Sequence, residues 1–137
     1  MTFDLAAFLA TAGVGRKIVQ LKPKQAFFSQ GSSADSIFYL QTGRAKLTVV
    51  SHDGKEAGIA LLSPGEFVGE ESLASVGGMH MATATAMEAC SALEIAREEM
   101  IRAMHEEHSL FEVFLKFLLV RSIRTQADLC RPAVQLQ

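Results

Sequence analysis

Residues 65–72 read GEFVGEES, and no other stretch of the chain says as much about its fold. Glycine frees the backbone for tight curvature, so Gly65 and Gly69 let N–H groups converge on an anion. Glu70 directly follows the second glycine and offers a fixed carboxylate acceptor for a pair of hydroxyl groups. The pattern predicts a cradle for a sugar phosphate, which also needs a cation.

The cation that such a cradle needs is missing from the next strand. That strand reads MHMAT over residues 79–83, and no arginine or lysine occurs between Lys55 and Arg97. The sequence therefore predicts the backbone of a phosphate site without its main positive charge.

A longer pattern carries a family resemblance. Residues 36–56 read SIFYLQTGRAKLTVVSHDGKE, and together with the box at 64–70 they resemble the cyclic-nucleotide-binding domain of the Crp–Fnr family of bacterial transcription regulators. The resemblance covers about residues 5–129. It implies a mainly β fold with helices: a double-stranded β-helix, or jelly roll, with a short N-terminal helix and a long C-terminal dimerisation helix.

The resemblance also implies a ligand site. Gly69 and the backbone N–H groups of Glu71 and Ser72 would face the phosphate, and Glu70 would hold the ribose hydroxyl. On the long helix, Thr125 and Gln126 match positions that touch the ligand in the family and would form the far wall. The alternative is that the glycines only shape a corner of the barrel and that the glutamate is solvated.

The family's phosphate-binding arginine falls on His80, and the serine after it falls on Met81. An arginine–phosphate pair is bidentate and charge-assisted, so its loss costs about 3–5 kcal/mol, or roughly a hundredfold to a thousandfold or more in affinity. A histidine with the ordinary pKa of about 6.5 is mostly neutral at pH 7 and offers one donor. We expect weak or absent cAMP binding, with no certain cofactor and a nucleotide or small anion as the candidate ligand.

The composition indicates one folded domain. The chain has 137 residues, of which 49% are hydrophobic and 20% charged, and its net charge of −2 gives no basic face for nucleic acid. Cys90 and Cys130 form no metal or disulfide pattern, which indicates reduced thiols and a cytoplasmic protein. No secretory signal is recognisable, and the most apolar run, residues 110–120, is too short to span a bilayer.

Short strands between turns are predicted over residues 16–97. Polar and apolar residues alternate over 45–50, and Asp53-Gly54 is a two-residue hairpin signal that joins this strand to 56–62. Alanines alternate strictly with threonines over 82–86, so a neighbour should approach that face closely. Repeated short strands at this spacing are typical of a jelly roll.

Helices are predicted at both ends. Residues 3–12, inside an N-terminal segment 1–15, carry apolar residues at helical spacing. Residues 98–131 form the C-terminal helical part, which begins with a short helix over 98–106. A long helix follows over 110–129.

The long helix has a start and a stop signal in the sequence. Ser109 and Glu112 have the spacing of a capping box, in which the serine side chain opens the helix. Pro132 is expected to stop the helix, because proline lacks the N–H group that helix hydrogen bonds need.

Apolar residues cover nearly the whole circumference of the long helix, and only Glu112 and Lys116 leave a solvated stripe. A helix that is apolar on two sides is buried on two sides, here on its own barrel and on a second copy across a two-fold axis. The family resemblance implies the same homodimer. The face towards the second copy is expected to include some of Phe114, Phe117, Leu118 and Arg121. The alternative is a helix buried inside its own domain.

No helix-turn-helix domain is expected in this chain. In the family the long helix leads into such a domain, which reads the major groove of DNA. Two helices and a turn need roughly twenty residues, whereas eight follow Leu129. Contact with DNA is therefore expected only through a domain that is missing here, and both a truncated product and a stand-alone sensor remain open. No membrane partner is expected.

Two other function classes fit a jelly roll: a cupin-type metal-dependent enzyme and a dimerisation scaffold without a ligand. A cupin metal site needs a His-x-His pair, whereas His52 and His80 are isolated. His105 and His108 have helical spacing for a shared metal, but such residues are ordinary at a helix junction. The sequence offers no recognisable histidine and aspartate pair that would activate Cys90 as a nucleophile. We expect no catalytic residue and no metal ligand, and interpret the chain as a sensory and dimerisation domain.

Overall fold

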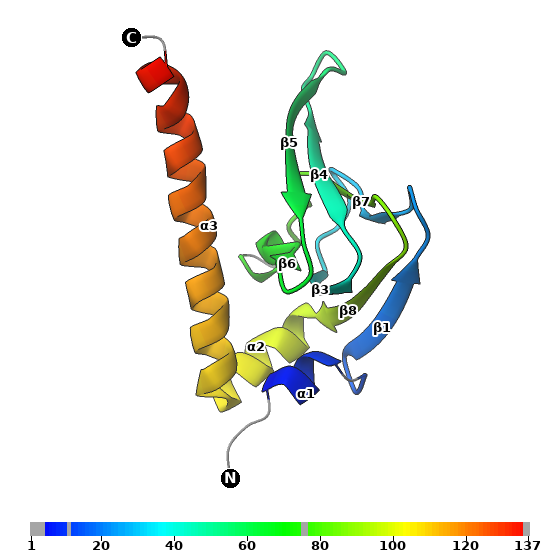
Figure 1. Ribbon diagram of the computed structural model, residues 1–137. Coiled ribbons are helices and arrows are strands. Elements are labelled where there is room, and N and C mark those ends of the chain that lie inside the picture. Colours follow the sequence, from blue (N-terminus) through cyan, green and yellow to red (C-terminus); the bar gives the residue numbers. More distant parts are fainter. Residues whose placement is uncertain (1–4, 11, 75–76, 136–137) are drawn as a thin grey trace.

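The computed structural model describes residues 5–10, 12–74 and 77–135. Figure 1 shows a roll of β-strands with one long helix standing beside it and two shorter helices at its lower end. Within the described residues the strands are β1 Arg16–Leu21, β2 Ala26–Phe28, β3 Ser36–Thr42, β4 Ala45–Val50, β5 Glu56–Leu62, β6 Phe67–Val68, β7 Thr83–Ala86 and β8 Cys90–Ala96. No helix in this part of the chain is long and apolar enough to cross a membrane.

The strands form two four-stranded sheets with the orders β1-β8-β3-β6 and β2-β7-β4-β5. All pairings are antiparallel, and strands that are neighbours in a sheet are mostly distant in the sequence. This arrangement of two sheets with crossing connections is the jelly roll that the sequence predicted, so the predicted fold class is confirmed.

Two buried clusters hold the fold together. One lies between the two sheets, and the other lies between the first sheet and the helices. Neighbouring residues of β3 serve both clusters, because successive side chains of a strand point to opposite faces: Ile37 packs under the helices and Phe38 packs between the sheets. Each fully buried side chain of this size contributes about 1.5–3 kcal/mol.

The helices follow the predicted order. They are α1 Leu5–Ala10, α2 Arg97–Glu106 and α3 His108–Gln135, and a short 3₁₀ helix, η1, covers Glu70–Leu73. Helix α2 lies within one residue of its predicted bounds. The ends of the predicted helix over 3–12 fall partly on residues outside the described ones.

The predicted start and stop of the long helix are wrong. Glu107 is extended, with φ −123° and ψ 98°, and its carbonyl accepts hydrogen bonds from the N–H groups of Leu110 and Phe111. Glu107 thus takes the capping position, α3 begins at His108, and Ser109 lies inside the first turn instead of capping it. At the other end α3 continues through Pro132, so this proline does not end the helix although it removes one backbone hydrogen bond.

The hairpin and the alanine row are formed, with one difference from expectation. The β4–β5 hairpin is closed by residues 51–55 and not by a two-residue loop, with Ser51 N–H bonded to the Lys55 carbonyl at 2.8 Å. Gly54 has φ +82°, a conformation that glycine adopts without strain. Ala84 and Ala86 of β7 are fully buried, which confirms the close approach predicted for that face.

Helix α3 has an inner and an outer apolar face, as the sequence predicted, but the two faces are assigned differently. Phe114 is buried, and Phe117 and Leu118 pack against the same cluster of the chain's own fold. The expected dimer face was therefore wrong, because an all-round apolar sequence does not reveal which side a helix turns to its own barrel. The outer face carries Phe111, Val113, Leu115, Leu119, Val120 and Ile123, each at least 40% exposed.

Candidate functional site

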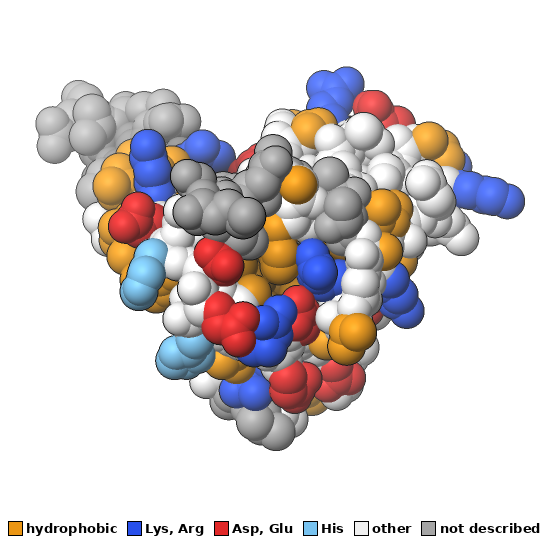
Figure 2. Space-filling model, turned by 90° about the horizontal axis from the view of Figure 1, so that it is seen from below, with side chains coloured by type: hydrophobic (Ala, Val, Ile, Leu, Met, Phe, Trp, Pro, Cys, Tyr) orange, Lys and Arg blue, Asp and Glu red, His pale blue; other side chains and the backbone are white. Residues whose placement is uncertain are grey.

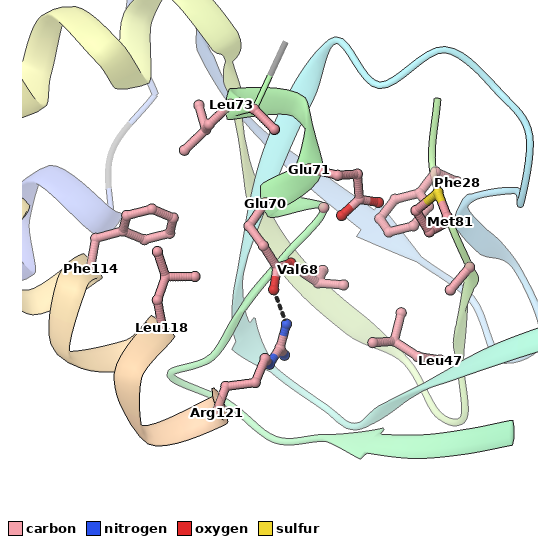
Figure 3. A pocket seen from close by; sticks show the side chains of 13 residues that line it. Phe28, Leu47, Val68, Glu70, Glu71, Leu73, Met81, Phe114, Leu118 and Arg121 are labelled. Carbon is pink, nitrogen blue, oxygen red and sulfur yellow. Dashed lines mark hydrogen bonds and ion pairs between the residues drawn. The ribbon is translucent and has the colours of Figure 1, made fainter. Parts of the chain in front are cut away.

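A cavity of about 520 Å³ lies between the β-roll and α3. Figure 3 shows α3 contributing Phe114, Leu118 and Arg121 on one side, while the roll contributes the opposite wall. The lining residues from the roll are Phe28, Leu47, Val68, Gly69, Glu70, Glu71, Leu73, Ala74, Met81 and Ala82. The cavity thus joins the GEFVGEES box to the long helix.

Gly69 shapes the floor of this cavity. It has φ +85° and precedes η1 as its capping residue. A Cβ atom at this position would lie 3.3 Å from His80 Cε1 and 3.3 Å from Phe28 Cε2, so a larger residue would push both rings. Glycine is required here for its backbone conformation and for this close approach.

Glu70 is paired with a residue from the long helix. The Arg121 guanidinium donates to the Glu70 carboxylate through Nη1 and to the Phe67 carbonyl through Nη2, the latter at 3.2 Å. Its Cζ atom also lies 4.7 Å from the centre of the Phe117 ring, a cation–π contact. The dashed line in Figure 3 marks the ion pair, which ties α3 to the cradle.

His80 turns away from the cavity and into the roll. Its side chain is 3% exposed, and its ring stacks on Phe28 with centroids 3.7 Å apart and an interplanar angle of 12°. Nδ1 donates to Glu71 Oε1 at 2.7 Å, since a carboxylate only accepts. Backbone hydrogen bonds with Gly31 and Ser32, both 2.8 Å, fix the segment in place. His80 is a wall behind the cavity and does not line it.

Comparison with known proteins establishes the family. The model of the cyclic nucleotide-binding domain family matches residues 18–107, about two thirds of the chain. The chain belongs to this family. It is 34% identical over 102 residues to the cyclic AMP receptor protein of Thermus thermophilus, covering 74% of this chain and 46% of that protein.

Two further proteins that this cyclic nucleotide-binding domain resembles are transcription regulators. The cAMP-activated global transcriptional regulator CRP of Salmonella typhimurium is 30% identical over 73 residues, which cover 53% of this chain and 35% of that protein. The chain thus spans less than half the length of these relatives. A transcriptional regulator from Thermotoga maritima superposes with a TM-score of 0.78 at 19% identity, covering 96% of this chain and 99% of that one, which shows the shared fold.

Within this cyclic nucleotide-binding domain, the residues expected to bind a ligand are only partly gathered. Gly69, Glu70 and Glu71 line the cavity, and Met81 lines it from the segment just before β7. Ser72 is fully buried beneath it, and its hydroxyl has no partner among the described residues. Their role in binding stays a prediction.

The predicted far wall lies elsewhere on α3. Gln126 is exposed and does not line the cavity, and the side chain of Thr125 lies outside the described part. The long helix contributes instead Phe114, Leu118 and Arg121, which stand three or four residues apart and so share one face.

Sequence reasoning missed Arg121 as a residue of the site. A signal was present, because Arg121 is the charged residue at the end of the stripe formed by Phe114, Phe117 and Leu118. When a charged residue lies on the same helix face as buried apolar residues, it is partly buried too and needs a polar or charged partner. That partner is expected on the surface against which the helix packs. The all-round apolar pattern predicts Arg121 on the dimer face instead.

Other reactive groups of the domain lie away from the cavity. Burial raises the pKa of the Cys90 thiol, and its Sγ lies 3.3 Å from the carbonyls of Arg44 and Glu88. Among the described residues no group of three or more His, Cys, Asp or Glu side chains could hold a metal ion. Figure 2 shows acidic and basic side chains intermixed on the face seen from below.

Proposed function

We propose that this chain is the sensory and dimerisation domain of a Crp–Fnr-like transcription regulator in the cytoplasm, and not an enzyme. The observation that carries the proposal is the pairing of Glu70 in the cradle with Arg121 on the long helix. A second pair, Arg124 with Glu66 at 4.0 Å, joins the same two elements. A ligand that occupies the cavity and disturbs these ion pairs changes the position of α3 on the roll. Ligand binding is thereby coupled to the geometry of the dimer.

The proposal includes weak or absent binding of cAMP. The residue where the resemblance places the phosphate-binding arginine is His80, whose ring stacks on Phe28 and whose Nδ1 is occupied by Glu71. The missing bidentate pair costs about 3–5 kcal/mol. Glu71 adds a second carboxylate to a wall that already holds Glu70, and like charge repels a phosphate.

The dimer that we propose uses the outer face of α3. Phe111, Leu115 and Leu119 stand four residues apart and are 46%, 43% and 56% exposed. Residues at this spacing form one row on a helix, and a second copy of the row can cover it across a two-fold axis. The inner face is already buried on the roll, so the outer row is the surface left for the partner.

DNA contact belongs to a separate helix-turn-helix domain in this proposal. The described part of the chain forms a β-roll and three α-helices, and all three helices contribute side chains to the cluster packed on the first sheet. The intermixed charges of Figure 2 give that face no basic stripe for phosphates.

Light scattering together with metal analysis tests the proposal against the cupin alternative. A sensory and dimerisation domain is expected to be a dimer without bound metal. A cupin enzyme would carry metal in a ratio of about one per chain, and stoichiometric metal would overturn the proposal.

A further inference from the structure

The cavity has lost the features that suit a phosphate. His80, the residue where the family resemblance implies a cation, stacks on Phe28 and does not line the cavity. Two carboxylates, Glu70 and Glu71, line the wall with one guanidinium, that of Arg121. The residues that line the wall thus include more carboxylates than cations, which disfavours an anionic ligand.

The rest of the cavity is apolar. Apart from Gly69 and the three charged residues, the lining side chains are hydrocarbon or thioether, and the largest are Phe28, Leu73, Phe114 and Leu118. They come from both the roll and α3, so an occupant would touch both at once (Figure 3). The volume of about 520 Å³ lies within the range of roughly 300–1,000 Å³ that small-molecule sites have.

We infer that this cavity binds an uncharged, mainly apolar small molecule whose single hydroxyl or N–H group donates a hydrogen bond to a wall carboxylate. The inference rests on the proposed sensory function and names the chemical class of its ligand. An apolar body gains free energy by leaving water for this lining. One neutral donor satisfies a carboxylate oxygen without adding charge to the wall. Contact with Phe114 and Leu118 lets such a ligand bias the position of α3.

A matched pair of fluorescent probes tests the ligand class. N-phenylnaphthylamine is uncharged, apolar and has one N–H donor, and anilinonaphthalene sulfonate is the same skeleton with a sulfonate. We expect the neutral probe to bind the wild-type chain with a stoichiometry of one and at least about tenfold more tightly than the sulfonate. Equal or tighter binding of the sulfonate, or no binding of the neutral probe, would overturn the inference.

Two variants locate the probe. Ala82→Phe fills the cavity, and Leu118→Lys keeps a long side chain there but adds a charge. Each is expected to weaken the neutral probe at least about tenfold. The matched control is Val14→Phe, which enlarges a 93% exposed residue outside the cavity and should change nothing. Unaltered binding in both cavity variants, checked for native circular dichroism, would mean that the probe binds elsewhere and that the inference is wrong.

The same samples separate this inference from the proposed function. If cAMP binds weakly and the neutral probe does not bind, the ligand class is wrong while the sensory proposal stands. If cAMP binds at submicromolar concentration, the weak cAMP binding in the proposed function is contradicted, whereas stoichiometric metal would contradict the proposed function itself.

Discussion

The imidazole of His80 lies on the ring of Phe28, with 3.7 Å between centroids and 12° between planes. This stack, together with the hydrogen bond to Glu71, commits the histidine to the interior of the roll. The change at this position therefore does more than remove a charge. The arginine that the family resemblance implies here would reach the ligand, whereas the His80 side chain packs behind the cavity wall.

Restoring a cation at position 80 should depend on Glu71. In the variant His80→Arg, Met81→Ser the new guanidinium has the Glu71 carboxylate within reach, so we expect only a small gain in cAMP affinity. Adding Glu71→Gln frees the guanidinium, and the triple variant should bind at least about tenfold more tightly than the double. Isothermal titration calorimetry measures both.

The matched control for this series adds Glu98→Gln, instead of Glu71→Gln, to the double variant. Glu98 is an exposed residue of α2 that does not line the cavity. The Glu98→Gln substitution should leave the affinity of the double variant unchanged. An equal effect of the two glutamine substitutions would show that general charge, and not the pairing at position 80, sets the affinity.

Arg121→Ala should loosen α3 from the roll. The variant loses the Glu70 pair, the bond to the Phe67 carbonyl and the contact with the Phe117 ring. Arg121 and Glu70 side chains are 27% and 23% exposed, so solvent screens part of the charge interaction. We expect a loss of about 1–2 kcal/mol in the free energy of unfolding, measured with urea.

Arg44→Ala is the comparison for that loss. Arg44 pairs with Glu88 at 3.4 Å, but the two side chains are 68% and 52% exposed. Such a surface pair contributes little, and the variant should lose less than about 0.5 kcal/mol. Equal losses for the two arginines would contradict a specific link between α3 and the cradle.

The proposed dimer should depend on the outer row of α3. Leu115→Glu combined with Leu119→Glu places two charges in the middle of the row, and light scattering should then report a monomer. Val14→Glu changes another exposed apolar residue and should leave the dimer intact. A persisting dimer in the double variant would rule out this face.

The buried thiol of Cys90 should make stability fall in alkaline solution. Burial raises its pKa above the ordinary value of 9.0, so above that pH the unfolded chain loses the proton while the folded chain keeps it. The folded state then binds more protons than the unfolded state, and the free energy of unfolding decreases as pH rises. Urea unfolding of Cys130→Ser protein should show this decrease from about pH 9, and a Cys90→Ala version should show a shallower one.

Local sequence patterns predicted those features of the structure that depend on residues close together in the sequence. The box at 65–72 indicated the cradle, the alternating alanines indicated a close-packed strand, and Gly69 indeed needs a conformation that glycine favours. The errors concern contacts between distant segments. The partner of Glu70 is Arg121, which is 51 residues away in the sequence. No local sequence pattern identifies a partner so far along the chain.

The orientation of His80 shows the same limit. The family resemblance predicts a place at the ligand for this residue, whereas its side chain contacts Phe28 and Glu71, which come from other segments. The capping of α3 failed for a related reason. Ser109 has the right side chain for a cap, but α2 ends at the extended Glu107, whose carbonyl accepts the first hydrogen bonds of α3 in its place.

Calorimetric titration of the wild-type chain with cAMP tests the central claim most directly. The account predicts no binding at submicromolar or low-micromolar concentration, because His80 supplies no cation and Glu71 adds negative charge to the wall. A submicromolar dissociation constant with one site per chain would contradict it.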